Sequence, residues 1–96
     1  MSVKDEYVEK LKTQLDEWSA DIDVLEERAR KLDAELRVKA DEQLILLRAK
    51  RDEARIKLKE IQDSAGDAWQ ELRKGGDEAW ASIKHALAEA RKKFGE

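Results

Sequence analysis

The chain has 96 residues and no cysteine; 45% of its residues are charged and 5% are aromatic. Without cysteine it has no disulfide, thiolate metal site or cysteine nucleophile, and its formal net charge of −3 is too small to indicate nucleic-acid binding. Abundant Ala, Leu and charged residues, with no proline, are typical of long helices. We therefore expect an all-α long-helix coiled coil in place of a compact single-chain core, with its apolar stripe buried against a helix of the same chain or of another copy.

Residues 3–63 are predicted to form one long coiled-coil helix. From Val8 to Leu36, apolar residues recur with alternating gaps of three and four. This heptad spacing places a narrow apolar seam along one side of a helix. Trp18 lies in that seam, and its size favours an antiparallel or multi-helix assembly over a parallel dimer.

The start of this helix is predicted near Ser2. Ser is a favourable N-cap residue, and Asp5 and Glu6 follow it within the first turn. Acidic side chains there are stabilised by the positive end of the helix dipole.

The heptad spacing slips after Leu36, because Ala40 stands where a strict heptad would use Lys39. One extra residue relaxes the left-handed supercoil. The charge also changes: residues 1–36 hold 6 basic and 11 acidic side chains, whereas residues 37–62 hold 8 and 5. Antiparallel or staggered packing would place these complementary segments side by side. The alternative is a chance imbalance on solvated faces.

Residues 67–94 are predicted to form an amphipathic helix with an 11-residue repeat, in which Trp69 corresponds to Trp80, and Leu72 corresponds to Ile83 and Phe94. A period of 11 residues is close to that of a straight helix.

Two glycine-containing segments bear on whether the helix is continuous. Around Ser64–Asp67 the chain either turns into a helical hairpin or kink, with Gly66 ending one helix and Asp67 capping the next, or continues as helix. The repeat continues in phase through Gly75 and Gly76, so we expect this pair to be helical.

No group of residues points to catalysis or cofactor binding. His85 is the only histidine, and its neighbours at four residues' distance are Ala81 and Glu89, which make an incomplete metal site. Most acidic residues have a basic residue three or four positions away, as expected on an exposed helix. We predict a protein that is not an enzyme and has no cofactor, metal or small-molecule substrate.

Three segments resemble a group of small bacterial coiled-coil-domain proteins described as stress-response proteins. They are EYVEKLKTQLDEW with IDVLE at residues 6–26, LRAKRDEARIKLKEI at residues 47–61, and GDAWQELRKGGDEAWASIKHALAEA at residues 66–90. The resemblance implies an all-helical cytoplasmic protein associated with stress, and it implies no catalytic residues.

Residues 1–96 are accordingly predicted to be a single elongated helical domain that self-associates into an oligomer or filament. The alternative function is reversible binding to a membrane surface through the Trp-containing helix, because Trp favours the lipid headgroup level. Residues 1–10 lack the apolar segment of a signal peptide, which agrees with a cytoplasmic location. The predicted partners are further copies of the chain, antiparallel or multi-helix, with a lipid surface as the second candidate and no nucleic acid.

The residues predicted to form the self-association interface are the large apolar residues of the stripe. They are Val8, Leu11, Leu15, Trp18, Ile22, Leu25, Leu32, Leu36, Leu44, Leu47, Leu58, Ile61, Trp69, Leu72, Trp80, Ile83, Leu87 and Phe94.

Overall fold

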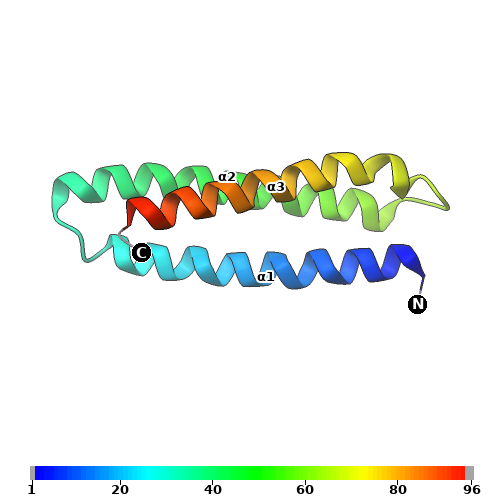
Figure 1. Ribbon diagram of the computed structural model, residues 1–96, viewed down its shortest axis with the longest axis horizontal. Helices are drawn as coiled ribbons and strands as arrows, with labels where there is room; N and C mark the ends of the chain where they lie inside the picture. The colour runs from blue at the N-terminus through cyan, green and yellow to red at the C-terminus, as the bar shows by residue number, and fades with distance from the viewer. Residues whose placement is uncertain (1, 95–96) are drawn as a thin grey trace.

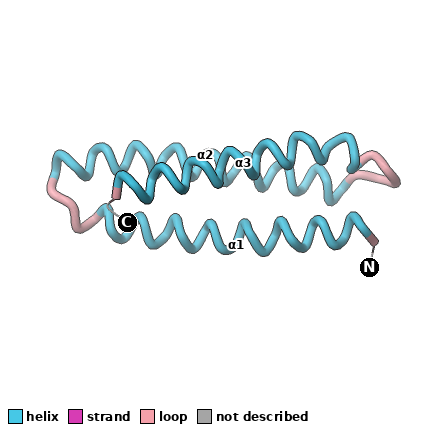
Figure 2. The backbone as a smooth tube through the Cα atoms, viewed as in Figure 1, coloured by secondary structure: helices cyan, strands magenta, loops and turns pink. Residues whose placement is uncertain are grey.

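A computed structural model describes residues 2–94, which form three helices joined by two short turns. The helices are α1 (Val3–Ala29), α2 (Ala34–Asp63) and α3 (Trp69–Lys93). They run up, down and up along a body of 52 × 19 × 17 Å, so α3 ends beside the α1–α2 turn (Figure 1). Figure 2 shows that loops occur only at the two turns and at the ends of the described chain. The predicted all-α fold is confirmed.

Helix α1 begins as predicted, with Ser2 as its N-cap. The Ser2 Oγ accepts a hydrogen bond from the Asp5 backbone N–H at 3.1 Å, and the Asp5 carboxylate accepts one from the Ser2 N–H at 3.5 Å. This reciprocal capping box satisfies two backbone donors that have no partner within the helix.

The prediction of one continuous helix over residues 3–63 is wrong. Helix α1 ends at Ala29, and Asp33 caps the start of α2 by accepting a hydrogen bond from the Leu36 N–H at 3.2 Å. The turn contains no glycine or proline, so the strongest sequence markers of a helix end are missing. Leu36, predicted to continue the seam, lies in the first turn of α2 and is 51% exposed.

Of the two alternatives left open around Ser64–Asp67, a turn or a continuous helix, the structure has the turn. Ser64 is extended, and Gly66 has a φ of 56°, a left-handed conformation that glycine adopts without steric cost. Asp67 does not cap the next helix, however. Ala68 takes the N-cap position and makes no side-chain cap bond, so α3 starts two residues later than predicted.

Helix α3 continues through Gly75 and Gly76, as the repeat predicted. Gly76 is buried, and a Cβ built on it would lie 2.9 Å from Ile61 Cδ1 and 3.4 Å from the Tyr7 hydroxyl. The missing side chain therefore lets α3 approach α2 closely at this level.

The apolar stripes of the three helices pack together into a compact core within one chain, so the expectation that the chain lacks such a core is wrong. Two turns allow each amphipathic helix to cover the stripes of the other two, which removes apolar surface from water without a second copy. The core divides into two clusters that share contact with Trp18. Among residues 2–94, no charged residue is buried.

Polar contacts join the helices around this core. At one end the Lys4 ammonium donates to the Ser64 carbonyl at 2.6 Å. Toward the other end Arg48 pairs with Glu26 at 2.7 Å, and Arg91 pairs with Asp21 at 2.6 Å. The acidic first segment and the basic middle segment thus lie side by side, antiparallel and within one chain.

Candidate interaction surface

Most residues predicted for self-association lie inside the single-chain core. Thirteen are buried: Val8, Leu11, Leu15, Ile22, Leu25, Leu44, Leu47, Leu58, Ile61, Trp69, Trp80, Ile83 and Leu87. Trp18, Leu32, Leu72 and Phe94 are half-buried, and Leu36 is exposed. The buried residues therefore offer no free surface to a second copy.

The tryptophans of α3 pack against α1. Trp69 lies 5.7 Å from Tyr7 and Trp80 lies 5.9 Å from Trp18, measured between ring centroids. Both α3 indoles are 6% exposed, so in this bundle they face protein and their surface is closed to lipid.

Tyr7 links α1 to α3 at the edge of this aromatic contact. Its hydroxyl donates a hydrogen bond to the Asp77 carboxylate at 2.5 Å, and the Arg73 guanidinium lies 5.0 Å above its ring. Burial raises the pKa of Tyr7 above its ordinary value, and the hydrogen bond to Asp77 raises it further. The Tyr7 phenol is therefore held in its neutral form.

The main surface feature is an apolar row on the outward side of α2, which we call the outward stripe: Val38, Ile45 and Ile56. These side chains are 60%, 66% and 59% exposed. Val38 and Ile56 are eighteen residues apart, which is about five helical turns, so they point in the same direction, and Ile45 lies about 20° away. Ala49 is exposed between them, and Leu46, 46% exposed, lies about 80° around the helix from Val38.

The outward stripe has an acidic margin. Four glutamates lie on one side of it at intervals of 7, 11 and 7 residues, which keep one angular position on the helix. They are Glu35, Glu42, Glu53 and Glu60, all exposed.

The opposite margin of the stripe is mainly basic. Lys59, Asp41 and Asp52 lie next to the row on this side, and Arg37, Arg48 and Arg55 lie farther around the helix. Arg48 reaches back to Glu26 on α1, and its hydrogen bond to that carboxylate lowers the pKa of Glu26. The two margins of the stripe therefore differ in charge.

Sequence reasoning did not identify the outward stripe. Its residues fall outside the series of three- and four-residue gaps that marks the inward face. The available signal was the recurrence of β-branched residues at intervals of 7 and 11 among charged residues, which defines a second apolar direction on α2.

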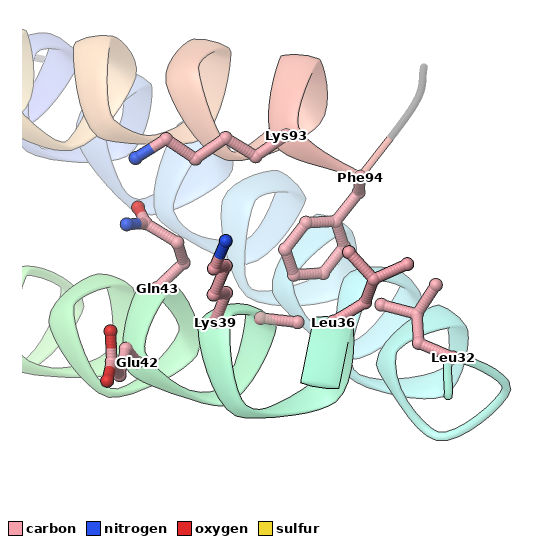
Figure 3. Close-up of a pocket in the computed structure, with 8 residues that line it drawn as sticks. Leu32, Leu36, Lys39, Glu42, Gln43, Lys93 and Phe94 are labelled. Atoms are coloured by element: carbon pink, nitrogen blue, oxygen red, sulfur yellow. The ribbon is translucent and has the colours of Figure 1, made fainter. Parts of the chain in front are cut away.

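A pocket of about 490 Å³ lies where the start of α2 meets the end of α3. Its lining residues are Leu32, Leu36, Lys39, Ala40, Glu42, Gln43, Lys93 and Phe94. Figure 3 shows Phe94 beside Leu36 and Leu32, with Lys39, Gln43 and Lys93 extending into the space between α2 and α3.

The described residues hold no group of three or more His, Asp or Glu side chains placed to bind a metal ion. His85 is exposed on α3. None of the helices in residues 2–94 combines the length and the hydropathy that crossing a membrane requires.

These features define a three-helix bundle with a second apolar face on its middle helix. No protein-family model matches the chain, and no curated protein or solved structure shows significant similarity to it. The resemblance to stress-response proteins therefore stays a prediction.

Proposed function

We propose that this protein is a non-enzymatic interaction module that pairs with a second copy of itself through the outward stripe of α2. The observation that supports this most strongly is the exposure of Val38, Ile45 and Ile56 in one row. Single exposed apolar residues are ordinary, whereas an aligned row rimmed by charges is typical of a helix-pairing surface.

The occupant we favour is a second copy in parallel orientation, because of the charged margins. A two-fold axis parallel to the helices places the acidic margin of one α2 beside the basic margin of the other, whereas an antiparallel pair would place like margins together. This differs from the antiparallel or multi-helix association predicted from the sequence, because the antiparallel packing of the three helices occurs within the chain. Such a two-fold pair also closes, so it favours a dimer over a filament.

The pair should be weak and depend on concentration. The stripe from Val38 to Ile56 is about 27 Å long at 1.5 Å per residue, which gives an interface at the small end of specific protein contacts. Such a module suits reversible assembly, and we propose a stress-associated role in the bacterial cytoplasm on the basis of the sequence resemblance.

The first experiment measures molecular mass by sedimentation equilibrium over a range of concentrations. The double variant Ile45→Ser, Ile56→Ser should raise the dimer dissociation constant at least tenfold, because both copies lose two buried aliphatic contacts. The matched control is Val24→Ser, which removes a 50% exposed apolar residue from α1 and should leave the dissociation constant unchanged. A wild-type chain that stays monomeric at millimolar concentration would refute the proposal.

The second experiment tests orientation, using the absence of natural cysteine. In a parallel pair Val38 meets Val38 of the other copy, so Val38→Cys should form a disulfide-linked dimer under mild oxidation. In an antiparallel pair it would instead face Ile56. Cross-linking only in a mixture of Val38→Cys and Ile56→Cys would show that the parallel arrangement is wrong.

A further inference from the structure

The pocket between the start of α2 and the end of α3 has two chemically different ends. Leu32, Leu36 and Phe94 form an apolar end, and the first and last of these also pack on the core. Lys39 and Lys93 approach the other end from different helices, as Figure 3 shows. A ligand that spans the pocket would therefore meet carbon at one end and ammonium groups at the other.

The two lysines are available for a ligand. Within residues 2–94, neither Lys39 nor Lys93 forms an ion pair, whereas Lys12, Lys57, Lys59 and Lys92 each pair with a carboxylate. The lining contains one carboxylate, Glu42, which Figure 3 draws apart from both ammonium groups. The formal charge of the lining is thus positive, with two basic residues and one acidic residue.

The side chain of Gln43 extends between the ends of the two lysines in Figure 3. An amide N–H there adds a neutral donor to two charged ones, and hydrogen bonds that involve a charged group are stronger than neutral ones. Three donors from two helices form a better receptor for a carboxylate than for a neutral or cationic head group.

We propose that this pocket binds one medium-chain aliphatic carboxylate, with the carboxylate between Lys39 and Lys93 and the alkyl chain against Leu32, Leu36 and Phe94. The volume of about 490 Å³ lies within the range of small-molecule sites. Apart from Glu42, which also belongs to the acidic margin, the pocket shares no residue with the outward stripe or its margins, so the proposal does not depend on dimer formation.

The test uses decanoate below its micelle concentration and the full chain labelled with ¹⁵N for NMR. Saturable shifts should occur at the amides of Leu32, Ala40, Gln43 and Phe94. Each methylene added between hexanoate and decanoate should tighten binding about three- to fourfold. Decanol and decylamine, which share the chain but lack the negative charge, should bind at least tenfold more weakly.

The variants distinguish binding through the carboxylate from nonspecific hydrophobic binding of the alkyl chain. Lys39→Gln and Lys93→Gln should each weaken decanoate binding about fivefold, a figure reduced for the exposure of the side chains, and should leave decanol binding unchanged. Lys84→Gln, an exposed lysine on α3 away from the pocket, is the matched control and should bind as the wild type does.

Four results would overturn the proposal. The first is an absence of saturable shifts, and the second is equal binding of decanoate and decanol by wild type and variants, which would indicate unspecific adsorption. The third is a set of shifts centred on Ile45 and Ile56, which would place the ligand on the outward stripe. Binding of anionic vesicles without binding of free decanoate would assign the lysines to a membrane surface and would also refute the proposed site.

Discussion

Helix α2 has large aliphatic residues on opposite sides, and the two sides meet different environments. Leu47 points inward and is fully buried, whereas Ile45, two residues earlier, is 66% exposed. The two residues are chemically similar, so hydrophobicity alone does not decide which of them joins the core. The deciding factor is the packing direction that α1 and α3 impose on α2, which leaves the outward stripe available for another molecule.

The largest expected effect tests this contrast directly. Leu47→Ala should lower the free energy of unfolding by about 2–5 kcal/mol, because it removes buried methyl groups and leaves a cavity. Ile45→Ala should change it by less than about 0.5 kcal/mol, because its side chain is already in water. Chemical denaturation at a concentration where the chain is monomeric measures both. Similar losses in the two variants would contradict the assignment of the faces.

Gly75 and Gly76 show the same contrast between an open and a packed position on α3. Gly75→Ala should stabilise the protein by about 0.5–1 kcal/mol through helix propensity, because a Cβ there meets nothing within 4 Å. In Gly76→Ala the same gain is opposed by the 2.9 Å approach to Ile61 Cδ1, and overpacking costs about 1–3 kcal/mol. Because the propensity gain is the same in both variants, thermal unfolding should rank Gly75→Ala above Gly76→Ala by the overpacking cost of about 1–3 kcal/mol. Equal midpoints would mean that Ile61 can move aside.

Tyr7 is half-buried at the edge of the core, so we expect its substitution to change the free energy of unfolding less than the core substitutions do. Tyr7→Phe should cost about 0.5 kcal/mol, the low end for a hydrogen bond, because the Asp77 carboxylate is screened by solvent.

The pH dependence at Tyr7 follows from the raised pKa. The unfolded chain releases the phenol proton near pH 10 while the folded chain keeps it, so stability should fall as the pH rises above 10. Denaturation curves at pH 9 and pH 11 should show a smaller decrease in Tyr7→Phe than in the wild type. An identical decrease in both proteins would assign the alkaline effect to other groups.

The smallest effect is expected at the solvent-facing pair of Glu26 and Arg48. Because Arg48 lowers the pKa of Glu26 in the folded state, the pair stabilises the fold above the unfolded pKa of Glu. This contribution is lost as the pH falls through the folded value. Glu26→Gln should flatten the acid limb of the stability curve slightly, as followed by circular dichroism. A steeper acid limb in the variant would reverse the predicted sign.

Much of the fold could be predicted from the sequence, because helix formation and amphipathic stripes are local properties. Spacing identified the residues that form the core, and Gly66 marked the second turn. The first turn was missed because it depends on Asp33 as a cap and on the packing gained when α2 folds back on α1. That packing gain depends on residues far apart in the sequence, and no glycine or proline marks the position of the turn.

The interaction surface was less predictable than the core. The residues of the inward face were identified as apolar contact residues, but the contacts were assigned to a second copy of the chain. An apolar stripe does not reveal whether the helix that packs on it belongs to the same chain or to another copy. The pocket joins Leu32 and Lys39 to Lys93, residues brought together only by two chain reversals. Its lysines looked like ordinary solvated charges in the sequence.

The α1–α2 turn contains no left-handed residue, since Gly66 is the one described residue with a positive φ. Asp33 is extended in the turn, but residues 30–33 include no glycine or proline, so each can also adopt helical backbone angles and no steric strain favours the reversal at this point. What holds the chain folded back is the Asp33 cap and the burial of α1 against its neighbours. This turn has the properties of a hinge for domain swapping, in which a straightened α1–α2 segment would exchange α1 between two copies and retain most core contacts.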